Sequence, residues 1–128
     1  MKQFLIDTNI ILRFFLQNNL KLADQAEAYF QKAKAGKISL FCPQIVIFEL
    51  VFVLEKVYQF EKGKVIAKLK SFLLTAYIEI ETREILLKAM KVYQKKKIDF
   101  VDIFLFVLAK EKSLEILSFD RDFRKLKR

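Results

Sequence analysis

Short apolar segments alternate with longer helical patterns along this chain, and the alternation restricts the fold more than any other feature. The segments that read as strands are residues 3–7, 38–42, 76–81 and 114–119. Helical periodicity is found in residues 8–16, 22–36, 44–58, 62–74, 83–97 and 99–112, and a short basic helix follows residue 119. Because strands that alternate with helices build parallel sheets, we predict an α/β/α sandwich around a central, mostly parallel sheet.

The chain has the length and composition of one folded domain. Its 128 residues lie within the usual size of a single domain. A hydrophobic fraction of 54% is sufficient for a core and exceeds that of disordered chains. Two glycines and one proline leave little material for a flexible linker. We therefore expect residues 1–128 to form a single domain.

The number of cysteines and the length of the apolar segments indicate the cellular compartment. Cys42 is the single cysteine, so an intramolecular disulfide is excluded and a reducing cytoplasm fits. Asp7 and Arg13 interrupt the apolar stretch near the start, and no small-residue cleavage site follows it. The other apolar runs are too short for a membrane span. We expect a cytoplasmic protein without membrane contact.

The net charge is strongly positive: 24 Lys and Arg against 15 Asp and Glu give 24 − 15 = +9. Basic residues are concentrated in residues 32–37, 95–97 and 121–128. Such charge is typical of a chain that binds a polyanion, because Lys and Arg neutralise phosphates. Surface lysines that serve solubility alone would give the same balance, so both interpretations stay open.

The chain contains no histidine, which removes several kinds of active site. Ser-His-Asp triads, Cys–His pairs and zinc sites built from histidine and cysteine are excluded. Hydrolytic chemistry would have to use carboxylates, lysines, hydroxyl groups or a metal ion bound through oxygen.

Two acids stand where predicted strands end. Asp7 closes the first strand and Asp120 follows the fourth. Aspartate at a strand-to-helix junction often serves only as a helix N-cap. Thr8 or Asn9 could cap the first helix in place of Asp7, and Asp122 could replace Asp120. The capping role therefore does not require either acid.

Glu49 interrupts a very apolar helix. Its neighbours three and four residues away are all apolar: Ile45, Val46, Phe52 and Val53. No basic residue lies within helical pairing reach on that face. A buried carboxylate must be paired, protonated or bound to a metal ion, so we expect Glu49 to be functional.

Asp99 and Asp102 are three residues apart at the start of another apolar helix. Asp99 suits the N-cap, and Asp102 suits the first turn, where the helix dipole favours a negative charge. A purely structural role fits Asp102 less well, because Val101 and Ile103 enclose it.

The βα pattern can bring Asp7, Glu49, Asp102 and Asp120 to one edge of a parallel sheet. Carboxylates gathered there repel one another and raise each other's pKa values. A divalent cation removes this repulsion. Ligation by oxygen alone favours Mg²⁺ or Mn²⁺, with phosphate oxygens completing the coordination.

These segments resemble PIN-domain ribonucleases, in particular the toxins of VapBC-type toxin–antitoxin pairs. The resemblance rests on "LIDTNIILRF" at residues 5–14, "IFELVFVL" around Glu49, "DFVDIFLFVLA" at 99–109 and "ILSFDRDF" at 116–123. It covers nearly the whole chain, in order. "DTN" alone is a weak motif, whereas the four segments together are specific.

The resemblance implies a Rossmann-like fold and a metal-dependent endoribonuclease, in which water activated by one or two Mg²⁺ or Mn²⁺ ions hydrolyses RNA. It assigns catalysis and metal binding to Asp7, Glu49, Asp102 and Asp120. Asp99 matches an additional metal-binding acid, and the supporting polar positions are Thr8, Asn9 and Ser118. Ile103 departs from the small residue that commonly follows the third acid.

The resemblance also implies partners: an RNA substrate, an antitoxin protein and a second copy in a homodimer. A housekeeping ribonuclease in RNA processing or decay is an alternative with the same fold. A non-catalytic RNA-binding domain is another, and it would be favoured by a missing core acid. A phosphoacceptor signalling domain also holds Mg²⁺ with aspartates, but the helix position of Glu49 does not suit it.

Overall fold

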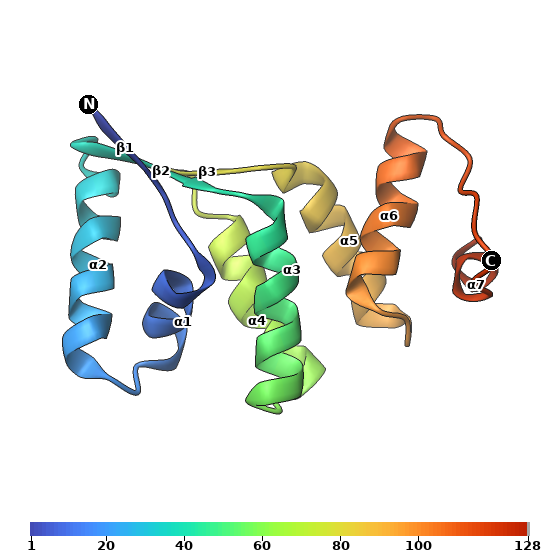
Figure 1. Cartoon of the computed structure of the whole chain (residues 1–128), viewed down its shortest axis with the longest axis horizontal. Coiled ribbons are helices and arrows are strands. Elements are labelled where there is room, and N and C mark those ends of the chain that lie inside the picture. Colours follow the sequence, from blue (N-terminus) through green and yellow to red (C-terminus); the bar gives the residue numbers. More distant parts are fainter. Residues whose placement is uncertain (128) are drawn as a thin grey trace.

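The computed structural model describes residues 1–127 and contains a parallel sheet of three strands (Figure 1). The strands are β1 (Lys2–Leu5), β2 (Ile38–Cys42) and β3 (Ile78–Ile80), in the order β1-β2-β3. The central β2 pairs with both neighbours, and Leu40 stands between Phe4 and Ile78. The predicted α/β class with a parallel sheet is confirmed.

Helices connect and follow the strands. Two helices join β1 to β2: α1 (Thr8–Leu16) and α2 (Leu20–Lys34). The connection from β2 to β3 contains α3 (Gln44–Phe52), the π-helix η1 (Val53–Val57) and α4 (Lys62–Leu73). After β3 come α5 (Arg83–Lys95), α6 (Phe100–Glu111) and α7 (Asp122–Leu126). Figure 1 shows α1 to α4 on the same side of the sheet, below it in that view.

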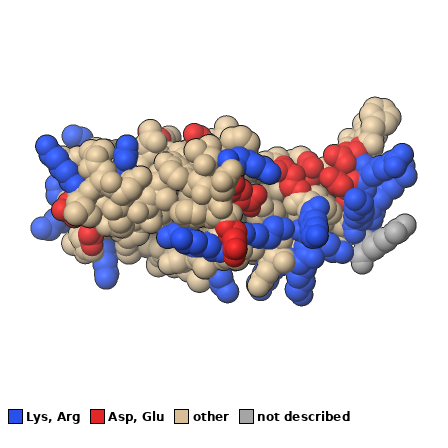
Figure 2. Space-filling view, turned by 90° about the horizontal axis from the view of Figure 1, so that it is seen from below, with Lys and Arg blue, Asp and Glu red and all other residues tan. Residues whose placement is uncertain are grey.

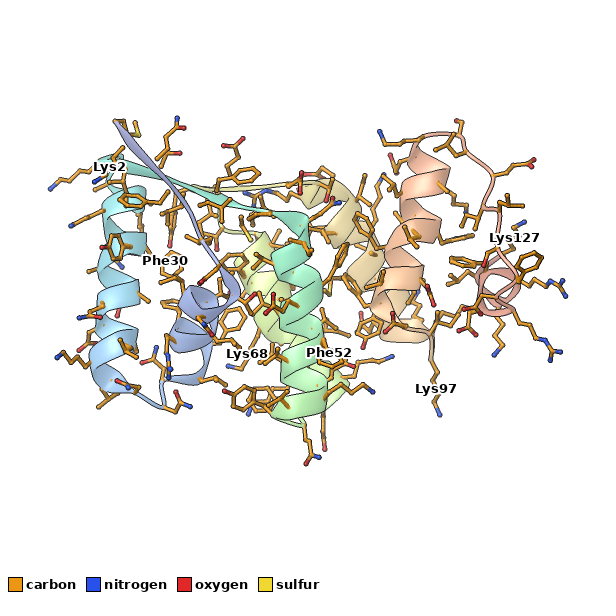
Figure 3. All side chains as sticks on the ribbon, in the orientation of Figure 1. Lys2, Phe30, Phe52, Lys68, Lys97 and Lys127 are labelled. Atoms are coloured by element: carbon orange, nitrogen blue, oxygen red, sulfur yellow. The ribbon has the colours of Figure 1, made fainter. Side chains whose placement is uncertain are left out.

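The core lies between the sheet and these helices. Leu40 and Ile78 are buried on the face that the helices cover, whereas Glu79, which points the opposite way, is exposed. Phe30 of α2 lies beside α1 (Figure 3), and its ring centroid is 5.1 Å from that of Phe14. The second face of the sheet is less covered, and the Leu5 side chain is 65% exposed there.

The predicted fourth strand, residues 114–119, does not form. This segment has no regular secondary structure, bends at Phe119 and pairs with no strand of the described chain. The sheet therefore ends at β1, and the fully exposed side chains of Leu117 and Phe119 point into solvent. The reason is the course of α6, which packs along α5 and leaves the following segment on the far side of the molecule from β1 (Figure 1).

Aromatic contacts hold α6 in this position. The ring of Phe104 lies 4.8 Å from that of Phe48 on α3, and Phe100 lies 5.4 Å from Tyr93 on α5. Phe100 and Phe104 are both buried, so α6 belongs to the main core. Among residues 1–127, no helix combines the length and the apolar character that crossing a membrane requires.

Candidate acidic site

Three aspartates from the C-terminal part of the chain form a compact group. Asp102 lies in the first turn of α6, Asp120 precedes α7, and Asp122 begins α7. One carboxylate oxygen from each lies within 4.8 Å of the others. Figure 2 shows acidic side chains gathered toward this end of the molecule, with basic side chains beside them. The group offers three oxygen ligands at the surface.

Local hydrogen bonds shape the turn that carries two of these acids. The Asp120 backbone N–H donates to Ser118 Oγ at 3.0 Å, and the Asp122 N–H donates to Asp120 Oδ1 at 2.9 Å. Asp122 also forms an ion pair with Lys125 at 3.5 Å. Asp120 therefore closes the turn before α7 and does not cap the helix, whose N-cap position is Arg121.

The charge state of Asp102 reflects this environment. Burial raises the pKa of its carboxyl, and the negative charges of Asp99, Asp120 and Asp122 raise it further. A divalent cation would stabilise the ionised form against all of these effects. Oxygen donors without histidine or cysteine suit Mg²⁺ or Mn²⁺, so the residues present fit such an ion.

Glu55 of η1 extends the acidic surface. Burial raises the pKa of Glu55, Lys56 and Lys62 lower it, and Asp99 raises it. The Tyr93 hydroxyl also donates a hydrogen bond to Glu55. We did not identify Glu55 or Asp122 as site residues from the sequence. For Glu55, the available signal was a second acid inside the same apolar helical pattern that contains Glu49.

Asp7 is exposed and caps α1. The Ile10 N–H donates to Asp7 Oδ1 at 3.2 Å. Thr8 and Asn9, the alternative caps that the sequence offered, do not occupy the N-cap position, because both already lie in the first turn of α1 and the Thr8 side chain is buried. Asn9 is exposed and lines a shallow surface hollow with Arg13 and Gln25. A capping role for Asp7 leaves its second carboxylate oxygen available.

Glu49 is exposed, so the expectation of a buried carboxylate is wrong. The apolar residues on the same face of α3 are exposed as well: Ile45 is 67% exposed and Phe52 is 59% exposed. The sequence shows only that this face is apolar, and it does not show that the face is covered. Glu49 therefore lies in an uncovered apolar strip rather than in the core.

The structure brings together Asp99, Asp102 and Asp120 of the predicted acids. Asp7 and Glu49 are not part of the three-aspartate group, and neither is among the charges that shift the pKa of Asp102. The predicted acids are thus not all in one group. Their assembly into one site stays a prediction.

Comparison with known proteins identifies the family. The PIN domain matches residues 4–128. A protein of Aquifex aeolicus (strain VF5) named VapC ribonuclease is 31% identical over 123 residues, which cover 95% of this chain and 90% of that protein. Both findings agree with the fold and with the resemblance found in the sequence. The chain therefore belongs to the PIN-domain family.

Proposed function

We propose that this protein is a metal-dependent endoribonuclease and the toxin of a type II toxin–antitoxin pair. The observation that carries the proposal is similarity over nearly the full chain to the PIN domain and to a protein named VapC ribonuclease. The acidic group, the absence of histidine and the positive net charge all agree with it.

Asp102, Asp120 and Asp122 are the residues that would hold a divalent cation, with Asp99 adjacent. We propose that Asp7 and Glu49 complete the catalytic site. The cation supplies Lewis-acid stabilisation of the phosphoryl group and lowers the pKa of coordinated water. The raised pKa of Asp102 means that the free site holds a proton more readily, so proton release accompanies cation binding.

Basic side chains beside the acids would hold the RNA. Arg121, Arg124 and Lys125 lie in or next to α7, which also carries Asp122. Lys96 and Lys97 precede Asp99 in the sequence, next to the start of α6. Phosphates bound by these side chains would bring the backbone of the RNA to the carboxylates. Arg128 lies outside the described residues.

A housekeeping ribonuclease without an antitoxin is the second candidate, because it would use the same site. The two differ in their gene neighbourhood and in their complexes. A small adjacent gene for a protein that co-purifies with this chain and inhibits its cleavage would establish the toxin role. An enzyme that stays active in the presence of every neighbouring gene product would favour the housekeeping role.

The first test is cleavage of total cellular RNA by the purified chain with Mg²⁺ or Mn²⁺, in parallel with Asp102→Asn. We expect defined fragments from the wild type, and none with EDTA or with the variant. Asp24→Asn on α2 is the matched control, because Asp24 is exposed and lies outside the acidic group. Cleavage that survives both EDTA and Asp102→Asn would overturn the proposal.

A further inference from the structure

Lys62, the first residue of α4, contacts the turn that joins α5 to α6. Its ammonium group donates to the backbone carbonyl of Tyr93 at 3.1 Å and to that of Lys96 at 2.9 Å. The same nitrogen lies 4.1 Å from the centroid of the Tyr93 ring. Its positive charge also lowers the pKa of Glu55. One half-buried side chain of α4 therefore holds the end of α5 from outside that helix.

Tyr93 connects this lysine to η1 and to α6. The Tyr93 hydroxyl donates a hydrogen bond to Glu55, which belongs to η1. The Tyr93 ring is buried, and its centroid lies 5.4 Å from that of Phe100, the first residue of α6. We call Lys62, Tyr93 and Glu55 the Lys62 cluster. The cluster joins four consecutive helical elements around one turn: η1, α4, α5 and α6.

The turn that the Lys62 cluster contacts leads into two acids of the candidate site. Asp99 occupies the N-cap position of α6, and Asp102 lies in the first turn of this helix. The Asp99 side chain is exposed and makes no capping hydrogen bond. Its carboxylate is therefore free of the helix end, and its place depends on the backbone of the turn. The charge of Asp99 acts on Asp102 and on Glu55, whose pKa values it raises.

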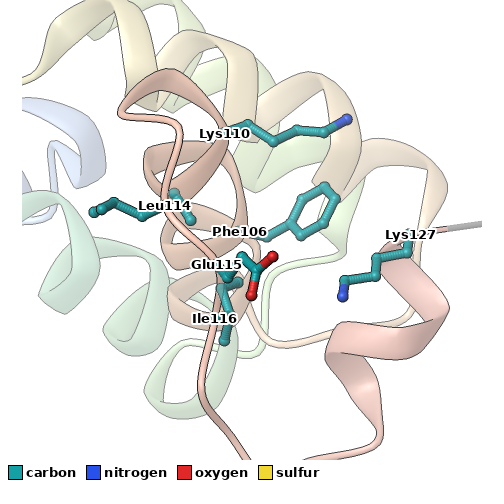
Figure 4. Close-up of a pocket in the computed structure, with 7 residues that line it drawn as sticks. Phe106, Lys110, Leu114, Glu115, Ile116 and Lys127 are labelled. Carbon is teal, nitrogen blue, oxygen red and sulfur yellow. The ribbon is translucent and has the colours of Figure 1, made fainter.

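The opposite end of α6 is packed less completely. A cavity of about 210 Å³ opens between the C-terminal half of α6 and the segment that follows it, lined by Phe106, Ile116 and other residues (Figure 4). At the start of α6, Phe100 is buried and contacts Phe48 of α3 and Tyr93 of α5. The first turn of α6 is therefore held from the side of α3 and α5, where the Lys62 cluster lies.

We infer that Lys62, Tyr93 and Glu55 are positioning residues, which fix the turn before α6 so that Asp99 and Asp102 keep their places for a divalent cation. The inference rests on the proposed function, because that function supplies the cation. The Lys62 cluster acts through the turn and touches neither the ion nor the RNA. Removal of such outer contacts typically costs about 10- to 100-fold in metal affinity or activity.

Electrostatics alone would give Lys62 the opposite effect. A positive charge near carboxylates repels a divalent cation, so a variant without that charge would bind the cation more tightly. Positioning has the reverse sign. Without the hydrogen bonds from Lys62, the turn can move and the carboxylates spread over more arrangements, which weakens cation binding. The direction of the change in cation affinity therefore separates the two effects.

The first test measures Mn²⁺ affinity by electron paramagnetic resonance of the free ion during a titration. The temperature is one at which circular dichroism shows every variant to be folded. Lys62→Met keeps an apolar stem and removes the ammonium group, and we expect about 10-fold weaker binding. Lys62→Arg should recover part of the affinity, because a guanidinium group can also donate to both carbonyls. Equal or tighter binding by Lys62→Met would overturn the inference.

Lys56→Met is the matched control. The charge of Lys56 also lowers the pKa of Glu55, but this side chain is exposed, whereas Lys62 is half-buried. The control removes the same charge from the same neighbourhood without loosening the turn. We expect unchanged or slightly tighter Mn²⁺ binding from Lys56→Met. Equal changes in both methionine variants would attribute the effect to charge and would rule out positioning.

Two smaller substitutions test the hydrogen bond between Tyr93 and Glu55. Tyr93→Phe removes the hydroxyl group and keeps the ring against Phe100. Glu55→Gln removes the charge and keeps an oxygen that accepts from the hydroxyl. Positioning predicts weaker Mn²⁺ binding by Tyr93→Phe and little change in Glu55→Gln. The reverse pattern would make Glu55 a ligand of the ion and would overturn its positioning role.

The second test follows amide hydrogen exchange in the metal-free protein, so it depends on neither the cation nor activity. The Ile103 N–H donates to the Asp99 carbonyl at 3.1 Å and reports on the first turn of α6. Lys62→Met should speed exchange of the amides in residues 98–104 several-fold, while Lys56→Met should leave it unchanged. Unchanged exchange in Lys62→Met would contradict the inference, because the turn would then be fixed without this lysine.

The two tests distinguish failure of this inference from failure of the proposed function. A wild type that binds no Mn²⁺ would remove the cation from the proposed function, and with it the role of the Lys62 cluster toward that cation. Faster exchange in Lys62→Met together with wild-type Mn²⁺ affinity would leave the proposed function intact. It would also overturn the inference, since the Lys62 cluster would then be a structural contact only.

Discussion

The carboxylates of Asp102 and Asp120 lie together although 120 − 102 = 18 residues separate them, and each has an oxygen within 4.8 Å of the other. This closeness raises the pKa of Asp102 together with burial, which is the larger cause. Groups of carboxylates that contact one another without a counter-charge destabilise the ionised state. Because a bound cation would remove this repulsion, we expect cation binding to raise the thermal stability of the folded protein.

Asp102→Asn should abolish the cation effect. We expect the metal-free variant to melt at the same temperature as the wild type or higher, because one of the repelling charges is gone. Mn²⁺ should raise the melting temperature of the wild type but not that of the variant, and RNA cleavage should fall at least about 100-fold. Thermal unfolding with and without Mn²⁺ measures the first two effects. An equal Mn²⁺ response in both proteins would show that Asp102 does not bind the ion.

Asp7 has two roles that different substitutions separate. Asparagine is as good an N-cap as aspartate, so Asp7→Asn should keep the hydrogen bond from the Ile10 N–H and leave stability nearly unchanged. Asp7→Ala removes the cap and should lower the free energy of unfolding by about 1 kcal/mol. Both variants should lose RNA cleavage. Full cleavage by Asp7→Asn would reduce Asp7 to a structural cap.

Local signals in the sequence predicted most elements well. The ranges 8–16 and 38–42 coincide with α1 and β2, since Asp7 caps the helix and the strand is apolar and partly β-branched. Residues 44–58 were predicted as one α-helix, but the backbone changes from an α-helix to a π-helix at Val53. No residue in this segment breaks the helical pattern, so the sequence gives no sign of the change.

The remaining wrong predictions depend on how segments that are far apart in the sequence pack together. Residues 114–119 have the composition of a strand, but a strand requires an edge, and the direction of α6 decides which edge is within reach. Glu49 was expected to be buried because its helix is apolar, yet the sequence does not show which side of α3 is covered. Asp122 was considered only as a cap, although its proximity to Asp102 depends on the same turn.

The Arg83 guanidinium donates hydrogen bonds to three backbone carbonyls near the start of β3. Its Nη1 donates to the carbonyls of Leu73 and Thr75, and its Nη2 donates to that of Ile78. Arg83→Met should lower the free energy of unfolding by about 2–3 kcal/mol, because half-buried carbonyls lose a charged donor. Arg83→Lys should recover only part of the loss, since an ammonium group lacks the guanidinium fork. Urea denaturation tests this, and a lysine variant as stable as the wild type would contradict it.

Cys42 should make stability fall at alkaline pH. Burial raises the pKa of its thiol from 9.0 to about 12, with a smaller opposing effect from Arg83. Between these values the unfolded chain releases the thiol proton and the folded chain retains it, so rising pH favours unfolding. From about pH 9 to about pH 10 the wild type should lose about 1 kcal/mol more than Cys42→Ala. Identical pH slopes in urea denaturation would show that the thiol ionises normally.

RNA binding should depend on salt through the basic residues beside the acids. Arg121 and Arg124 flank Asp122, so we expect both to contact phosphates. Each lost contact to single-stranded RNA should reduce the slope of log affinity against log salt by about 0.7, and Arg121→Ala with Arg124→Ala by about 1.4. Fluorescence titrations at several salt concentrations, with a metal-free protein to prevent cleavage, measure this slope. Lys21→Ala with Lys34→Ala removes the same charge from α2 and should change the slope little. Equal losses from both pairs would mean that binding follows net charge rather than a face beside the acidic site.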